Sequence, residues 1–388
     1  MQTIVQHGLM LLVLLGCPFS SAAAQADGGW PQWRGPDRSG VTEAKMTAWP
    51  PRQAWEVRFE RSESSPIIAD GKVYCLVGGE RATVVCLSAT DGHERWRQDF
   101  GSQRVTHGRF ARGDMKRYRG PLSTPAVGGG SVVALGVDGD LVALDVDSGE
   151  QRWQVNLHDA CGVVQRDAKR DFGCCSSPII TDDQVIVGVG GTQGTVMIFS
   201  LRDGRAGDSW GTGQWGHTSG PASLDGRVYM TLDHLVIGSQ RIPWQTKFAC
   251  NIPTPAVSGE LVAATSGYNV KRTRLYCNGE QVWESKVHAT TTSPIICEDK
   301  VYVGGSCLSV RDGSQLWSFE ADSFLLCNGG DRMLAEHKGT LRCYDTGNGR
   351  VLGAIDNVPK GNPSIAYGEG CILVKGGGAL ACYMAEPR

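Results

Sequence analysis

The feature that most constrains this chain is a short motif, Ser or Thr followed by Pro and then apolar residues, that recurs along most of its length. A degenerate copy, Ser323-Phe324-Leu325-Leu326, fits the gap between the last two prolines of the series, which is about twice the shorter spacings. Eight copies of one pattern predict units that pack mainly on their neighbours. The other copies are centred on Pro66, Pro125, Pro178, Pro255 and Pro294, with weaker copies at Pro221 and Pro363, where Gly or Asn directly precedes the proline.

A second mark closes most units: a glycine followed four residues later by a tryptophan, as in Gly92 to Trp96. Between the two marks lie short alternating strands and glycine turns, which predict four antiparallel strands per unit. A tryptophan buries a large apolar area and still offers one N–H to a neighbour, so we expect it to dock each blade on the next. The candidate docking residues are Trp55, Trp96, Trp153, Trp210, Trp244, Trp283 and Trp317, with Trp210 and Trp244 in looser versions of the mark and Gly353 in the place of a seventh repeat tryptophan.

The expected fold is therefore an all-β, eight-bladed propeller of four-stranded blades. The last unit has no strand with tryptophan, whereas a spare one, residues 54–59, precedes the first unit. We expect this N-terminal strand to complete the last blade, which removes the open sheet edges. Residues 27–388 form one propeller domain in this prediction, with blades starting near residues 64, 123, 176, 219, 253, 292, 323 and 362.

The N-terminus predicts export. Residues 8–19 are apolar and lead to Ala24-Gln25-Ala26, a small-x-small cleavage site, so residues 1–26 are expected to be a signal peptide. A secreted or periplasmic protein follows from this, with a lipoprotein anchored through Cys17 as the alternative. No later stretch approaches the ~20 apolar residues of a transmembrane span. The net charge of −2 predicts no general attraction to nucleic acid.

Cysteine is abundant, and removal of Cys17 with the signal would leave 13 of the 14. Export permits disulfides, but an odd count leaves at least one thiol unpaired within the chain. Cys75 and Cys86 lie symmetrically about one predicted hairpin, and Cys371 and Cys382 about another. Each pair is interpreted either as a disulfide or as packed, inert thiols.

One repeat, Ala-Leu-Asp-Val-Asp-Ser-Gly-Glu-Gln-Arg-Trp at residues 143–153, resembles the signature of pyrroloquinoline-quinone (PQQ)-like repeats. It is similar to the tryptophan-docked propellers of quinoprotein dehydrogenases and of the outer-membrane protein assembly lipoprotein. The opening segment, residues 30–40, resembles the start of many secreted PQQ-binding-like repeat proteins. The resemblance implies the fold strongly and the function weakly, because one fold hosts many functions.

A quinoprotein dehydrogenase of this kind would hold PQQ and calcium in the central channel, with a catalytic Asp, a Trp under the quinone and a disulfide between adjacent cysteines. Only the cysteines have a counterpart here, Cys174-Cys175, and the chain lacks the common hydrolase, metalloprotease and P-loop motifs. No catalytic residue and no metal ligand is therefore assigned. Adjacent Cα atoms lie about 3.8 Å apart, short for a disulfide. We favour two separate thiols over a vicinal disulfide that forms a ligand platform.

Two long links between blades, residues 101–122 and 156–175, are expected on the same face of the ring. The first is strongly basic. Loops held by a rigid scaffold often bind ligands, so the sequence favours an exported, non-catalytic binding or scaffold module of the cell envelope. Its partner would be an envelope or extracellular protein, or a polysaccharide, and the alternative is a PQQ-dependent quinoprotein-type oxidoreductase. The candidate ligand- or partner-binding residues are Arg109, Arg112, Lys116, Arg117, Tyr118 and Arg119, together with Cys174 and Cys175.

Overall fold

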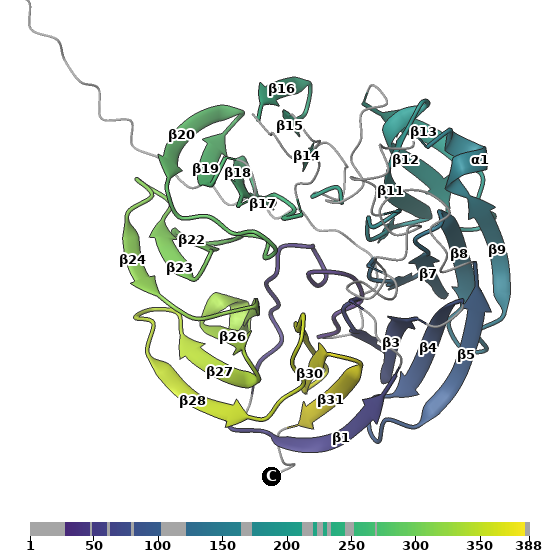
Figure 1. Cartoon of the computed structure of the whole chain (residues 1–388), viewed down its shortest axis with the longest axis horizontal. Coiled ribbons are helices and arrows are strands. Elements are labelled where there is room, and N and C mark those ends of the chain that lie inside the picture. Colours follow the sequence, from purple (N-terminus) through teal and green to yellow (C-terminus); the bar gives the residue numbers. More distant parts are fainter. Residues whose placement is uncertain are drawn as a thin grey trace, which may run out of the picture.

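The computed structural model describes residues 28–46, 49–59, 63–78, 81–101, 122–163, 173–211, 220–222, 228–230, 234–244, 252–267 and 270–384. Eight antiparallel sheets stand around a ring (Figure 1). Seven of them have four strands, and the fourth blade has three described strands. The prediction of an eight-bladed, all-β propeller is confirmed.

The blades follow the chain in order, and their strands have the following bounds. The first three blades contain β2 (Ile67–Ala69), β3 (Lys72–Val77), β4 (Ala82–Ser88) and β5 (Glu94–Phe100); β6 (Ala126–Gly128), β7 (Ser131–Leu135), β8 (Asp140–Asp145) and β9 (Gln151–Asn156); and β10 (Ile179–Thr181), β11 (Gln184–Gly191), β12 (Gly194–Ser200) and β13 (Ala206–Trp210). The fourth and fifth contain β14 (Val228–Met230), β15 (His234–Ile237) and β16 (Gln240–Pro243); and β17 (Ala256–Ser258), β18 (Leu261–Ser266), β19 (Arg272–Cys277) and β20 (Glu280–Ser285).

The sixth and seventh blades contain β21 (Ile295–Cys297), β22 (Lys300–Val303), β23 (Ser306–Ser309) and β24 (Gln315–Ser318); and β25 (Ser323–Cys327), β26 (Arg332–His337), β27 (Thr340–Asp345) and β28 (Val351–Asp356). The eighth contains β29 (Ser364–Gly368), β30 (Cys371–Gly376), β31 (Ala379–Met384) and β1 (Arg52–Arg58). The described helices are α1 (Leu157–Cys161) and a single 3-10 turn, η2 (Asn328–Gly330).

Strand β1 closes the ring. It pairs antiparallel with β31, with Trp55 opposite Cys382, and so supplies the outer strand of the last blade. This confirms the predicted use of the N-terminal strand. The middle strands of the blades are buried on both faces, as in β4, whereas outer strands such as β5 are largely exposed. The core therefore lies between neighbouring sheets, because each sheet covers the face of the next.

Tryptophans dock one blade on the next. The Nε1–H of Trp55 donates to Ala89 O of the first blade at 2.8 Å. Its ring lies on Gly92, where an added Cβ would come within 2.7 Å of the indole. The glycine and the tryptophan of one motif thus belong to two different contacts between blades. The glycine leaves space for the tryptophan ring of the preceding blade, and the tryptophan packs on the glycine of the next blade. The same arrangement joins Trp96 to Val146 and Gly149, Trp153 to Leu201 and Gly204, and Trp283 to Val310 and Gly313.

The other candidate docking residues depart from this geometry. Trp317 lies on Gly349, but its Nε1 has no acceptor. Trp244 is fully buried under the guanidinium of Arg274, 4.8 Å from the ring centroid, and its Nε1 is also unpaired. Trp210 ends β13 and is partly buried.

A tryptophan from elsewhere replaces the one that the seventh unit lacks. Trp49, just before β1, lies so close to Gly353 of β28 that an added Cβ would clash with its Nε1. The residue that stands in place of the repeat tryptophan therefore leaves room for this indole ring. The short N-terminal stretch around Trp49 and Trp55 thus packs on both neighbours of the last blade.

The Ser/Thr–Pro motif also has a structural role. The backbone N–H of Ser65 donates to Thr124 Oγ1 at 3.1 Å, and that of Thr124 to Ser177 Oγ at 3.0 Å. The same bond joins Thr254 N to Ser293 Oγ at 3.0 Å. The hydroxyl before the proline therefore links the inner strands of adjacent blades.

The cysteine pairs differ from the expected symmetry. Cys86 lies opposite Tyr74, not Cys75, and this one-residue offset places the two thiols on opposite faces of the sheet. This geometry excludes the disulfide interpretation of Cys75 and Cys86 and leaves the interpretation as packed thiols. Cys371 and Cys382 are diagonal neighbours whose thiols hydrogen-bond. No disulfide is found among the described cysteines. Burial raises the pKa of Cys75 to about 12, which keeps that thiol protonated and inert.

Candidate functional site

The interior of the ring holds a piece of the chain's own N-terminal region. Residues 28–46, which we name the channel segment, cross the middle of the ring (Figure 1). On one side, Trp30 exchanges two backbone hydrogen bonds with Ile68 of the first blade, and Pro31 O accepts from Val127 N of the second. On the other side, Val41 and Thr42 pair with Leu326 of the seventh blade. The segment is thus held by backbone bonds to inner strands.

Two arginines carry the contacts across the ring. Nη2 of Arg34 donates to Pro294 O of the sixth blade and to Ser39 O at 2.9 Å. Nη2 of Arg38 donates to Pro221 O, in the link before the fourth blade, at 3.1 Å. Both arginines have the left-handed backbone conformation, with φ of 67° and 55°, which non-glycine residues adopt rarely. Strained backbone of this kind is held in place by its surroundings and is common at functional sites.

The electrostatics of this arginine pair are unusual. Arg34 is 8% exposed and Arg38 is 2% exposed, yet Nε and Nη1 of both have no hydrogen-bond partner. Neither forms an ion pair with a carboxylate of the described residues. Burial lowers the pKa of each to about 9, and the charge of Arg34 lowers that of Arg38 further. Both remain cationic at neutral pH.

An aromatic ring lies beside the two charges. The guanidinium carbons of Arg34 and Arg38 lie 5.7 and 5.2 Å from the ring centroid of Trp33, within the range of a cation–π contact. Trp33 is partly exposed and Asp37, at the tip of the turn, is exposed. Sequence reasoning treated residues 30–40 only as a family signature and did not identify these arginines. Two arginines inside a Trp-, Gly- and Pro-rich turn were the available signal.

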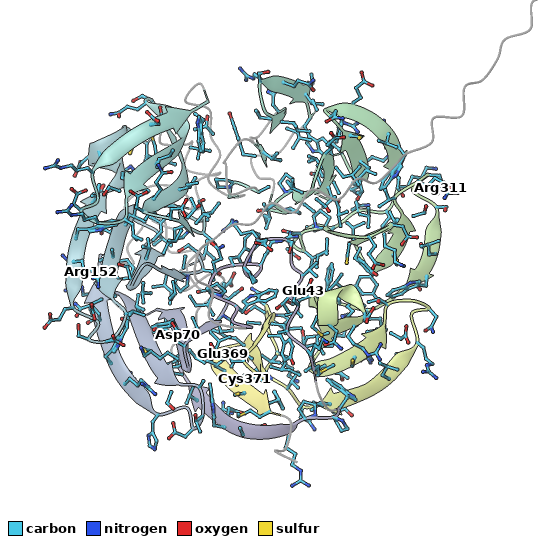
Figure 2. The ribbon with its side chains drawn as sticks, turned by 180° about the vertical axis from the view of Figure 1, so that it is seen from behind. Glu43, Asp70, Arg152, Arg311, Glu369 and Cys371 are labelled. Atoms are coloured by element: carbon cyan, nitrogen blue, oxygen red, sulfur yellow. The ribbon has the colours of Figure 1, made fainter. Side chains whose placement is uncertain are left out.

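Charged groups at the outer edge behave differently. Figure 2 shows Glu43 of the channel segment at the middle of the ring and Arg152 and Arg311 near its periphery. Arg152 pairs with Asp145 at 2.7 Å in a partly solvated ion pair, which contributes little stability. Among the described residues, the buried and partly unpaired Arg34 and Arg38 in the interior thus differ from Arg152 at the rim, which is paired and partly solvated.

The residues that the sequence singled out are only partly within the described chain. The basic candidates Arg109, Arg112, Lys116, Arg117, Tyr118 and Arg119 lie outside it. Cys174 is buried and Cys175 is partly exposed. Helix α1, capped by the Asn156 side chain, begins the second insertion, and Val163 bridges Gly191 of the third blade.

The channel does not offer the donors that PQQ with calcium would need. Among the described residues, no three His, Cys, Asp or Glu side chains come close enough to hold a metal ion. The arginines, in addition, would repel a calcium ion placed beside them. The described interior therefore does not fit the metal-bound cofactor, and no chemical step is derived through it.

Comparison with known proteins places the fold. A family model described as Outer membrane protein assembly factor BamB matches residues 50–210. The crystal structure of BamB from Moraxella catarrhalis superposes with a TM-score of 0.57 and 15% identity, over 87% of this chain and 98% of that one. The chain is thus similar to the PQQ-like β-propellers in its repeats and in its fold. This confirms the family that the repeats resemble.

Enzymes with the PQQ-like propeller are similar as well. Quinohemoprotein alcohol dehydrogenase from Comamonas testosteroni superposes with a TM-score of 0.63 and 14% identity, over 93% of this chain and 81% of that one. Quinohemoprotein alcohol dehydrogenase ADH-IIG of Pseudomonas putida is 27% identical over 164 residues, 40% of this chain. The match spans only 20% of that enzyme's length. Structural likeness at such low identity establishes the fold and leaves the activity open. Among the described residues, no helix is long and apolar enough to span a bilayer.

Proposed function

We propose that this PQQ-like propeller is an exported, non-catalytic binding module of the cell envelope. The observation that carries the proposal is the channel segment. It lies inside the ring, where the family resemblance would place a quinone, and bonds to inner strands on opposite sides. A propeller whose interior is filled by its own chain works as a rigid frame for its loops.

Removal of the channel segment to admit a cofactor would be costly. Trp30 is 3% exposed, and its two backbone bonds to Ile68, at 2.8 and 3.0 Å, would be lost. Gly40 lies against Ile295, where even an added Cβ would clash, so the segment is closely packed there. Burial of an aromatic side chain and pairing of buried backbone groups both favour the filled ring.

The proposed partner face carries residues 101–122 and 156–175. Both links join an outer strand to the next inner strand, so they belong to one face of the propeller. Arg109, Arg112, Lys116, Arg117 and Arg119, with Tyr118 among them, suit a partner rich in carboxylates. We expect this partner to be an acidic polysaccharide or an acidic envelope protein, met after export and with or without lipid attachment at Cys17.

The proposal that the propeller is a rigid, non-catalytic frame is tested by the addition of PQQ. PQQ with calcium is added to the mature protein, and binding is followed by calorimetry and by the melting temperature. We expect no saturable heat and no shift in melting temperature that depends on calcium. A ligand that binds only the folded state would stabilise it by about 2.7 kcal/mol at 100 times its Kd, which is easily seen. A clear shift that Cys174→Ser/Cys175→Ser abolishes would overturn the proposal.

The partner face is tested with polygalacturonate, a defined acidic polysaccharide. We expect the natural protein to bind polygalacturonate, and this binding should weaken as the salt concentration rises. Replacement of the five basic residues by Gln should abolish the binding. The matched control replaces Arg58 and Arg205, whose side chains are 82% and 87% exposed elsewhere on the ring. Equal loss in both variants would show that the face is not the site.

The second candidate, a PQQ-dependent oxidoreductase, is favoured by the similarity to the alcohol dehydrogenase over 164 residues. It requires the channel segment to leave and a calcium site to come from residues outside the described chain. The cofactor titration separates the two functions.

A further inference from the structure

We infer that Arg34 and Arg38 form a binding site for an oxyanion, a carboxylate or a phosphate group of a small ligand, inside the ring. This site goes beyond the proposed partner face, since it is built by the channel segment and uses none of the residues of the long links.

The inference rests on buried hydrogen-bond donors of the two arginines that have no acceptor. Nε and Nη1 of both arginines are buried without an acceptor, although each Nη2 is used. A buried charge without a counter-charge is strongly unfavourable, and folded proteins almost always pair it. The two charges also repel each other, since the charge of Arg34 lowers the pKa of Arg38. An anion that accepts from the unpaired N–H groups satisfies them and offsets the repulsion.

A purely structural role does not account for the pair. Bracing the carbonyls of Pro294 and Pro221 uses one nitrogen of each guanidinium. The remaining N–H groups, on Nε and Nη1 of each guanidinium, are charged donors that can each donate to an oxygen of a carboxylate or phosphate. Gln32 Oε1, also buried and unpaired in this turn, would accept from a protonated oxygen of such a ligand.

The ligand is small and can reach the site near Trp33. This ring is partly exposed while the arginines beside it are buried, so the pair lies just beneath the surface of the turn. The indole face adds a flat wall beside the two guanidinium groups. An anion with a planar portion fits this wall better than a bulky one does.

The test measures melting temperature and calorimetric binding of the mature protein in phosphate, citrate and chloride at matched ionic strength. We expect saturable binding of phosphate or citrate and no response to chloride. Whichever of the two oxyanions binds identifies the group. In Arg34→Met/Arg38→Met the response should disappear while a cooperative melting transition remains, because apolar side chains of similar length replace the buried charges.

Two further variants separate binding at the arginine pair from a general effect of charge. Arg38→Lys retains the charge without the guanidinium group, and we expect binding at least 10-fold weaker with native near-UV circular dichroism. Arg205→Met, at an 87% exposed side chain, should bind like the natural protein. Identical melting in all three salts would overturn the inference, as would a response that survives in the double Met variant or in Arg38→Lys at full strength.

Discussion

Two regions of the propeller bury nitrogen donors: the joint that Trp55 makes with the first blade, and the turn of residues 31–40 inside the ring. At the joint, Trp55 Nε1 donates to Ala89 O at 2.8 Å and the indole fills the space above Gly92. In the turn, Arg34 and Arg38 are as deeply buried, but two of the three guanidinium nitrogens of each remain unpaired.

This difference distinguishes a contact that stabilises the ring from a site inside the ring that binds a ligand. The joint is complete by itself, because the buried N–H of Trp55 donates to a carbonyl of the neighbouring blade. The turn is complete only with a group from outside the described chain. Changes at the joint should therefore affect folding, whereas changes in the turn should affect ligand response.

The largest effect is expected at the joint. Trp55→Ala removes a buried indole and its hydrogen bond from the strand that closes the ring, and should lower the free energy of unfolding by about 3–5 kcal/mol. Chemical denaturation measures this. Leu316→Ala in β24, a half-exposed apolar residue, is the control, with an expected change within about 0.5 kcal/mol. Similar losses in the two variants would contradict the docking role.

The irregular joint at the seventh blade should show coupling. Gly353→Ala places a methyl group against Trp49 and should cost about 1–3 kcal/mol. In a Trp49→Ala background the same change should cost much less, because the clash is gone. Gly207→Ala in β13, where an added Cβ meets only ordinary contact, is the matched control. An additive double-mutant cycle would show that Trp49 does not fill this place.

A third test concerns an unpaired group within the ring. Glu336 of β26 is fully buried; Oε1 accepts from Gly339 N at 2.6 Å, but Oε2 has no partner. Burial raises the pKa of Glu336. The folded state therefore binds this proton more tightly than the unfolded state does, so stability should fall as the pH rises from about 4.5 through the raised pKa.

Glu336→Gln should remove this part of the pH dependence, because the amide does not titrate. Unfolding free energies between pH 4 and pH 8 measure it. Glu280→Gln, at an exposed carboxyl in β20, should leave the slope unchanged. If Glu336→Gln follows the natural protein across the whole range, the buried carboxyl does not couple to folding.

The smallest effect is expected at the thiols beside the closing strand. Cys382 lies opposite Trp55 and hydrogen-bonds with Cys371, and both are free. Thiol counts of the denatured mature protein should therefore be the same with and without prior treatment with mild reductant. A count that rises after reductant would reveal a redox-active pair and would support a redox role for the cysteines.

The ring itself was predictable from local signals. Strands alternate with turns, and the two marks repeat, so the blade number and the closing strand could be derived before any contact was known. The position of Gly353 also marked an irregular joint. Cysteine pairing was less predictable, because a shift of one residue at the hairpin between β3 and β4 moved Cys86 away from Cys75.

The interior was decided by tertiary structure alone. Residues 28–46 carry no repeat, and their partners, such as Val127, Pro221 and Leu326, lie far along the chain on different blades. Only closure of the ring brings these inner strands together around the segment. The sequence by itself determined a propeller with its N-terminal strand in the last blade; burial of Arg34 and Arg38 followed only from the folded ring, because solvent exclusion depends on all the blades at once.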